Sequence, residues 1–394
     1  MFTIKQFKLR PIVFSLHRYI GLAIGLLLVI AGLTGSLLVF ADEIDHFLLA
    51  RQIGHVIPQG QQVSIESVLN TVKIAYSNQP ELKVERIYTL PEPDIPYRIW
   101  LRSSEGERTE INVNPYTGAI MGSRVWDNTL KTLTLKLHYQ LFAGDVGIQI
   151  MGVVALLVFI LCITGIILWP GWKRLISGFK IKWNAHPRRV NFDIHKVSGI
   201  IVAVFLGLIS FTGFCWNFYD FTQSIIYALT STPNPSNLVS QNITAKPPLS
   251  VTQLLQKADA ALPDEVTTYV LLPTKPEDAI VVGKKLPQES WKFGYSQIYL
   301  DQYTGEILRL KNGLKAPLGE KIWDSFGALH YGTFGGLPTR ILYVFVGLAP
   351  LILSITGFVM WRYRYRKKSR STTNSANFIE RLKHRLITSL AKRM

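Results

Sequence analysis

The chain has 394 residues, of which 48% are hydrophobic and 18% charged, and its formal net charge is +17. A basic chain, here with a pI near 9.8, seldom has a positive mean hydropathy, but this chain has one of +0.20. The apolar content excludes intrinsic disorder. Because only Cys162 and Cys215 occur, a disulfide scaffold, a zinc ribbon and a cysteine-ligated iron–sulfur cluster are excluded too. The charge suggests nucleic acid or an anionic surface as a partner, and its position decides between them.

Four apolar stretches without Lys, Arg, Asp or Glu predict transmembrane helices, because each is long enough to cross a hydrocarbon core of about 30 Å. They are Tyr19–Phe40, Ile148–Trp169, Val197–Tyr219 and Ile341–Trp361. The first stretch is too long for a signal-peptide core and lacks a small-x-small cleavage site, so we interpret it as an uncleaved span.

The charge divides sharply between the segments that flank these spans. Residues 1–18, 170–196 and 362–394 hold 22 Lys and Arg but only two acids, whereas the remaining segments hold 21 Lys and Arg against 24 Asp and Glu. Short basic flanks stay in the cytoplasm, so both termini are predicted inside, and membrane anchoring explains the charge better than nucleic acid does. The predicted division is 1–41 (N-terminus and first span), 42–147 (outside), 148–169 (span), 170–196 (basic loop), 197–219 (span), 220–340 (outside), 341–361 (span) and 362–394 (basic tail).

Each outside segment is predicted to contain one amphipathic helix followed by short strands. The first has a helix over Ser64–Tyr76 and strands over Val84–Leu90, Tyr97–Leu101 and Thr109–Asn114. The second has a helix over Ser250–Ala261 and strands over Val266–Leu272, Ala279–Lys285 and Gln297–Leu300. Both end in a turn that opens on Asn or Asp and closes on Gly, namely residues 114–118 and 301–305, followed by another short apolar run.

Histidine and Thr-Gly spacings reveal an internal repeat. His17 precedes Thr34-Gly35 by 17 residues, as His195 precedes Thr212-Gly213; His138 precedes Thr164-Gly165 by 26 residues, as His330 precedes Thr356-Gly357. The chain is therefore interpreted as two copies of one unit, over about 12–175 and 190–367. Because each copy has two spans, both enter the membrane in the same direction, as parallel repeats. The Thr-Gly pairs are interpreted as helix-packing residues.

The turn sequence Asp/Asn-x-Tyr-Thr-Gly after a helix and strands resembles the PepSY domain. With flanking spans that carry four repeated histidines, the chain resembles the PepSY-associated transmembrane family of iron-regulated bacterial inner-membrane proteins, as far as about residue 367. The resemblance implies a membrane α-helical fold of four spans in two parallel repeats, each with an extracytoplasmic α+β PepSY-like domain. It also implies b-type haem and the reduction of a ferric siderophore.

Four histidines at repeated positions are the candidate site residues. His17 and His195 are predicted at the cytoplasmic starts of two spans, and His138 and His330 just outside the other two. Two-fold packing brings His17 towards His195 and His138 towards His330, so each pair has the one-from-each-half arrangement that axial ligation of one haem iron requires. Interfacial hydrogen-bonding histidines, zinc and copper are the alternatives. No Cys-x-x-Cys-His occurs, so one or two haems would be of b type.

Other residues are weaker candidates. His46, His55, His186 and His384 lack a repeated partner, and His186 is interpreted as a loop residue. Aromatic residues beside the histidines are predicted to line part of a haem slot (Phe14, Tyr19, Tyr139, Phe192 and Tyr331). Further aromatic residues lie in the outside segments, where they are either near the acceptor or ordinary core and interface-belt residues. They are Tyr116, Trp126, Trp291, Tyr303 and Trp323.

One haem near each face predicts an electron relay across the bilayer. The cytoplasmic loop is too short for a nicotinamide or flavin domain, so a separate reductase or membrane quinol is the expected donor. By resemblance the acceptor is a ferric siderophore or another iron chelate, which makes the chain a haem-dependent ferric reductase. The alternatives are a PepSY binding module that regulates a peptidase and a small transporter. The tail, 368–394, lies outside the resemblance, and Phe378, Leu382, Leu386 and Leu390 have the spacing of an interfacial helix.

Overall fold

The computed structural model describes residues 9–234, 238–240, 247–289 and 291–391, with side chains as far as Tyr365. The predicted apolar face of the tail, residues 378–390, and His384 therefore lie outside the described side chains. The chain divides into two compact units. Unit 1 comprises Met1–Leu33, Val153–Phe211 and Phe345–Met394, and unit 2 comprises Thr34–Gly152 and Thr212–Val344.

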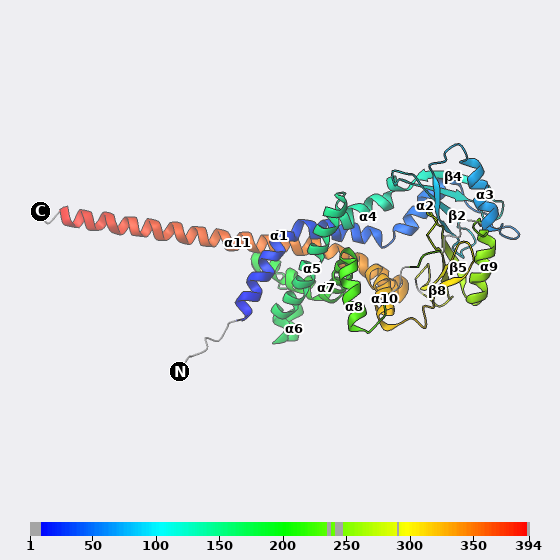
Figure 1. Cartoon of the computed structure of the whole chain (residues 1–394). Coiled ribbons are helices and arrows are strands. Elements are labelled where there is room, and N and C mark those ends of the chain that lie inside the picture. Colours follow the sequence, from blue (N-terminus) through cyan, green and yellow to red (C-terminus); the bar gives the residue numbers. More distant parts are fainter. Residues whose placement is uncertain (1–8, 235–237, 241–246, 290, 392–394) are drawn as a thin grey trace. The chain divides into compact units, whose positions relative to one another are not determined.

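Four helices in the described part are long and apolar enough to cross a membrane. They are α1 (Leu9–Leu38), α5 (Gly144–Leu168), α7 (Pro187–Asn217) and α11 (Gly336–Ala391), which are labelled in Figure 1. All four begin earlier than the predicted apolar stretches, because helical hydrogen bonding continues through polar flanks until a breaker; Pro187 is such a start. As a consequence, His17 and His195 lie about two turns inside α1 and α7 and not at their first residues. α11 contains its predicted stretch completely, whereas α1, α5 and α7 end one or two residues before theirs.

Small residues let α1 and α11 approach closely within unit 1. A Cβ on Gly32 would lie 2.4 Å from the carbonyl oxygen of Gly347, and one on Gly25 would lie 3.6 Å from the hydroxyl of Ser354. The Ser354 hydroxyl donates to the Gly25 carbonyl at 3.2 Å. Such close backbone approach is typical of helix packing in membranes, where apolar burial alone does not drive association.

Unit 2 contains one antiparallel sheet of eight strands, in the order β4-β3-β2-β1-β5-β6-β7-β8. The two predicted outside segments supply four strands each, and β1 joins them by pairing with β5, with Ile87 opposite Val270. The strands agree with the predicted runs to within about two residues, and the apolar runs after the turns form β4 and β8. The bounds are β1 Lys83–Tyr88, β2 Tyr97–Arg102, β3 Arg108–Val113, β4 Ile120–Val125, β5 Val266–Leu271, β6 Ile280–Lys285, β7 Ser296–Leu300 and β8 Ile307–Lys311.

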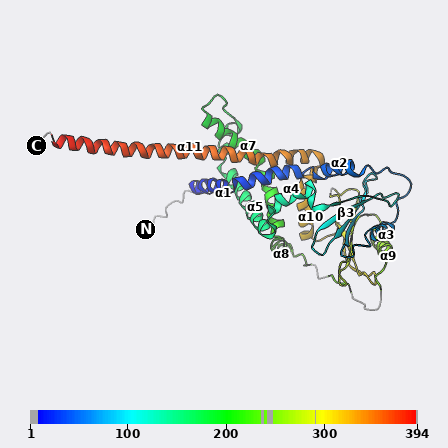
Figure 2. The ribbon, with the colours of Figure 1, turned by 90° about the horizontal axis from the view of Figure 1, so that it is seen from above.

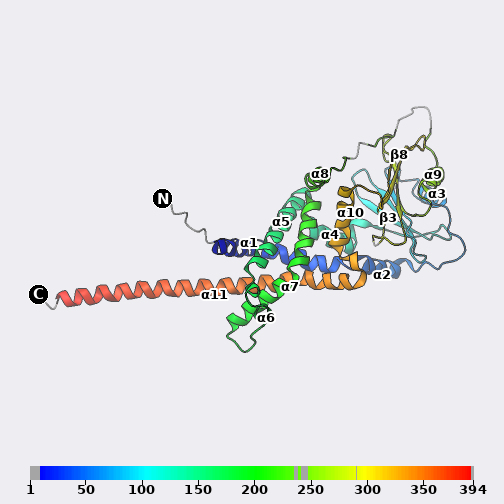
Figure 3. The same ribbon diagram turned by 90° about the horizontal axis from the view of Figure 1, so that it is seen from below.

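Helices α3 (Ile65–Ala75) and α9 (Val251–Ala261) cover one face of this sheet. They lie side by side in all three views (Figures 1, 2 and 3). Their apolar sides pack against alternate strand residues such as Ile99 and Ile298, which are completely buried. Ser64 and Ser250 cap the two helices by accepting from the backbone N–H three residues on, as the predicted helix starts require.

The predicted turns after β3 and β7 are confirmed. The Asn114 side chain accepts from the N–H groups of Tyr116 and Thr117, and Gly118 closes the turn at φ +70°. Asp301 and Gly305 repeat the arrangement, with Gly305 at φ +69°. A positive φ is a conformation that glycine adopts without steric cost, which explains the last residue of the signature.

Several shorter helices were not predicted from the sequence. In unit 2 they are α2 (Ala41–Ile53), α4 (Leu130–Gln140), α8 (Tyr219–Leu229) and α10 (Leu318–Tyr331), and in unit 1 α6 (Leu175–Phe179) lies within the basic loop. His138 and His330 belong to the last turns of α4 and α10. Their position is therefore held by separate short helices and not by extensions of the long ones.

Candidate functional site

His17 and His195 come together within unit 1, one from α1 and one from α7. Their ring centres are 6.4 Å apart and the ring planes are nearly perpendicular, at 87°. The Nδ1 atom of His17 is 2.8 Å from the hydroxyl of Thr164 on α5. The Nδ1 atom of His195 is likewise 2.8 Å from the hydroxyl of Thr356 on α11.

The threonine contacts determine which ring nitrogen carries the proton. The Thr164 hydroxyl donates to the carbonyl of Ile160 at 2.8 Å, and the Thr356 hydroxyl donates to that of Ile352 at 2.6 Å. A hydroxyl has one proton, so this network assigns each threonine oxygen as the acceptor of a bond from Nδ1–H of its histidine. The lone pair of each neutral ring is then on Nε2, the tautomer in which histidine binds a metal while Nδ1–H is held by a hydrogen bond.

His138 and His330 form the corresponding pair within unit 2. Their ring centres are 6.3 Å apart, with an angle of 75° between the rings. The Nδ1 atom of His138 is 2.9 Å from the hydroxyl of Thr34 on α1, and that of His330 is 2.8 Å from the hydroxyl of Thr212 on α7. All four threonines of the Thr-Gly pairs thus contact a candidate histidine.

The glycine of the pair leaves room for the histidine ring. A Cβ on Gly35 would lie 3.1 Å from Cε1 of His138, one on Gly165 would lie 3.3 Å from Cε1 of His17, and one on Gly357 would lie 3.6 Å from Cε1 of His195. A longer side chain at Gly35 or Gly165 would displace the ring. The Thr-Gly pairs are therefore more than packing residues: threonine orients a histidine, and glycine admits it.

Sequence reasoning found the threonines but did not predict these contacts. Their equal spacing from a histidine was visible, yet His17 bonds Thr164 and not Thr34, the threonine on its own helix. His138 bonds Thr34 in return. The sequence does show that each half contains two histidines and two Thr-Gly pairs, one pair for each histidine. Which threonine bonds which histidine depends on how the helices pack.

The separation within each pair fits one metal atom between the rings. Two imidazoles that bind one ion from opposite sides have ring centres about 6.4 Å apart, because the metal–nitrogen bond is about 2.0–2.1 Å and the ring centre lies about 1.2 Å behind its nitrogen. Within the described residues, no group of three or more His, Cys, Asp or Glu side chains is arranged to hold a metal ion. The two histidines of each pair could hold the iron of a haem, because a haem needs only two ligands from the protein.

In the His138–His330 pair, aromatic rings pack against His330. The ring of Trp216, which was not predicted, lies 4.7 Å from that of His330, and Tyr331 lies 5.7 Å from it. Trp291 stacks on Tyr331 at 5.7 Å with an angle of 17°. Tyr331 and Trp291 are thus the predicted aromatic residues that reach this pair, directly or through one ring.

The other predicted aromatic residues have different contacts. The hydroxyls of Tyr116 and Tyr303 donate to the carbonyls of Pro93 and Pro276, so they tie the turns to neighbouring loops. Trp126 packs on Trp100. The remaining contacts are Trp323 with Tyr219, Phe14 with Arg18 and Arg364, Tyr19 with Arg18, Phe192 with Arg189, and the Tyr139 carbonyl with Asn217.

The remaining described histidines take no part in these pairs. His186 accepts through Nδ1 from the N–H of Arg188 at 3.2 Å, so it caps the start of α7. His46 is half-buried on α2, and His55 is exposed beyond the end of that helix. The structure thus places the four repeated histidines in two pairs and leaves these three outside them.

Four membrane-spanning helices and an antiparallel α+β sheet unit define a multi-pass membrane protein. The family model described as the PepSY-associated TM region matches residues 14–364, so the chain belongs to this family. No curated protein matches the sequence.

Proposed function

We propose that the chain is a b-type haem electron-transfer protein that crosses the bacterial inner membrane and reduces an extracytoplasmic ferric chelate. The preferred candidate for this chelate is a ferric siderophore. The observation that carries this proposal is the duplicated site: two histidine pairs with ring centres 6.4 and 6.3 Å apart, each histidine bonded through Nδ1 to a threonine. Each pair would hold one haem, which would supply single-electron chemistry in its apolar surroundings.

The protein's own residues orient the ligands and control access. Each threonine holds its histidine ring in one orientation, as the outer hydrogen bonds of metal-binding histidines generally do. The glycine beside it keeps the ring close to the neighbouring helix. With both termini in the cytoplasm and two parallel repeats, the His17–His195 pair would face a cytoplasmic reductase or membrane quinol, and the His138–His330 pair would face the acceptor.

An absorption spectrum of the full-length protein, purified in detergent from haem-replete cells, tests the proposal. We expect a Soret band and bis-histidine spectra, and reoxidation of the dithionite-reduced protein by ferric chelates. The absence of a Soret band would refute haem binding and favour the PepSY binding module. A Soret band that survives replacement of all four histidines by alanine would refute the ligand assignment.

A further inference from the structure

The second face of the unit 2 sheet, opposite α3 and α9, carries arginines and aromatic rings. Side chains alternate along a strand, so Arg86 and Arg98 point away from the core that Ile87 and Ile99 enter. Most arginines on this face are paired: Arg108 with Glu85, Arg124 with Asp45 and Glu110, and Arg309 with Glu320.

Arg86 and Arg98 differ from these neighbours. Neither forms an ion pair with a carboxylate in the described part of the chain, and the Nε atom of each is buried without a hydrogen-bond partner there. Arg98 instead lies over the ring of Tyr88, with its guanidinium carbon 5.3 Å from the ring centre. A buried donor without a partner costs free energy, and an anion that reached it would recover that cost.

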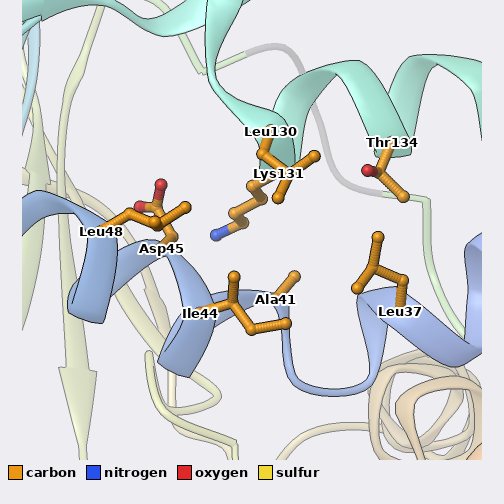
Figure 4. Close-up of a pocket in the computed structure, with 8 residues that line it drawn as sticks. All are labelled: Leu37, Ala41, Ile44, Asp45, Leu48, Leu130, Lys131 and Thr134. Carbon is orange, nitrogen blue, oxygen red and sulfur yellow. The ribbon is translucent and has the colours of Figure 1, made fainter.

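Two lysines next to this face add further positive charge. Lys131 of α4 and Lys292 both contact the carboxylate of Asp42. Two ammonium groups and one carboxylate together carry a net charge of +1. Burial lowers the pKa of Lys292 to about 8; Asp42 opposes this, whereas Lys131 and Arg98 lower the pKa further. The lysines are still partly accessible, with 21% and 31% of their side chains exposed. Figure 4 shows Lys131 reaching from α4 towards α2, beside a small hollow.

A continuous series of ring contacts leads from these cations to the candidate haem ligand. Phe293 contacts Tyr88 at 5.3 Å and Trp291 at 5.8 Å. Trp291 stacks on Tyr331, and Tyr331 contacts His330 at 5.7 Å. Lys292 lies over the ring of Phe293, with its nitrogen 4.8 Å from the ring centre. Arg98 and Lys292 therefore contact the rings at the far end of this path, Tyr88 and Phe293, and Lys131 lies beside Lys292 through their shared contact with Asp42.

We propose that Lys131, Lys292 and Arg98, together with Trp291 and Phe293, form an anion site that binds the electron acceptor as an anionic iron chelate with aromatic metal-binding groups. The inference rests on the proposed function, because it names the class of acceptor for that reaction. Partly desolvated cations favour an anion over a neutral chelate. Ring faces and a planar guanidinium stack on planar catecholate groups, which neutral hydroxamates lack.

Binding of redox-inert gallium chelates to the full-length protein in detergent, measured by calorimetry, tests the anion site without any electron transfer. The probes are gallium bound to a hexadentate tris-catecholate, which is trianionic, and to a hexadentate tris-hydroxamate with a neutral core. We expect the trianionic chelate to bind at least about tenfold more tightly, and added salt to remove most of the difference.

Matched variants assign the binding to these residues. Lys131→Gln combined with Lys292→Gln, and Arg98→Gln alone, should each weaken binding of the trianionic chelate about 5- to 20-fold and leave the neutral chelate unchanged. Arg98→Lys should restore part of the loss. The control is Lys73→Gln, which removes an exposed charge from α3 on the other side of the sheet.

Three results would overturn the anion site: equal binding of the two gallium chelates, unchanged binding in the variants, or the same loss in Lys73→Gln. Competition by millimolar inorganic phosphate alone, with no preference between chelates, would mark a general phosphate site and also overturn it. Because gallium is not reduced, these outcomes are independent of the Soret measurement. The haem proposal can thus be refuted while the anion site is supported, and the anion site can be refuted while the haem proposal is supported.

Discussion

The two histidine pairs share one local design but have different surroundings. In both pairs, histidines from the two halves of the chain stand 6.3–6.4 Å apart and are bonded through Nδ1 to threonine. His17 and His195 belong to long helices, whereas His138 and His330 belong to the ends of short ones. The orientation of the histidine rings therefore depends on the Thr-Gly element, which both pairs share, whereas the groups around each pair differ.

The ends of the short helices are themselves unlike. α10 ends on Gly332 at φ +70°, where a Cβ would lie 2.6 Å from the ring of Tyr343. α4 ends on Leu141 at φ +51°, followed by Phe142 at φ +56°. Non-glycine residues in the left-handed region cost roughly 1–2 kcal/mol each, so the His138 end of the site carries backbone strain that the His330 end avoids.

Removing one pair at a time gives the largest expected effect. His138→Ala with His330→Ala should lower the Soret absorbance per protein by about half and abolish reoxidation by external chelates, because under the proposed function the remaining pair would face the donor. His17→Ala with His195→Ala should lower the Soret absorbance equally but preserve rapid reoxidation of the remaining haem. Haem content and stopped-flow spectra measure both; identical reoxidation in the two variants would contradict the division of roles.

Filling the glycine positions should damage each pair separately. Gly35→Val and Gly165→Val place methyl groups against His138 and His17, and each is expected to lower haem retention at one site by about tenfold or more. Gly357→Ala is the milder control, because its Cβ would stand 3.6 Å from His195, an ordinary contact. Equal losses in Gly357→Ala and Gly35→Val would show that the glycines do not control the ring positions.

Deleting the threonine hydroxyls should weaken the site less than filling the glycines. Thr164→Val and Thr34→Val keep the side-chain shape but remove the partner of Nδ1, so haem affinity should fall at one site in each, by at most about 10-fold. The reduction potential of that haem should shift while the other stays constant, as redox titration measures. Thr→Ser restores the hydroxyl and should restore both quantities.

The smallest expected effect is a pH dependence of the anion site. Lys292 is charged below a pKa of about 8 and loses its charge as the pH rises through that value, while Asp42, whose pKa is lowered by the two lysines, stays ionised. Affinity for the trianionic gallium chelate should therefore fall about 3- to 10-fold between pH 7 and pH 9. Lys292→Gln should remove most of this slope, and a slope that persists would assign it to another group.

Much of the fold follows from local sequence patterns. Charge-free stretches predict the four long helices, alternation and capping residues predict α3, α9 and the strands, and the Asn/Asp-to-Gly sequences predict the turns at 114–118 and 301–305. The short helix α4 was missed because its apolar periodicity is weak, and α10 was missed because it follows a stretch that resembles loop sequence. The pairing of β1 with β5 was missed because an exposed strand edge has no sequence code for its partner.

The four spans, the segregation of basic residues and the equal spacing of four histidines can be predicted without a structure, because each is a local or periodic property of the chain. Only the tertiary structure decided that Thr164 and not Thr34 holds His17, and that two sets of four strands form one sheet. It also decided that Arg98 has no carboxylate among the described residues while Arg108 does. The physical reason is that such contacts join residues more than a hundred positions apart, or residues on one sheet face, and depend on how whole elements pack.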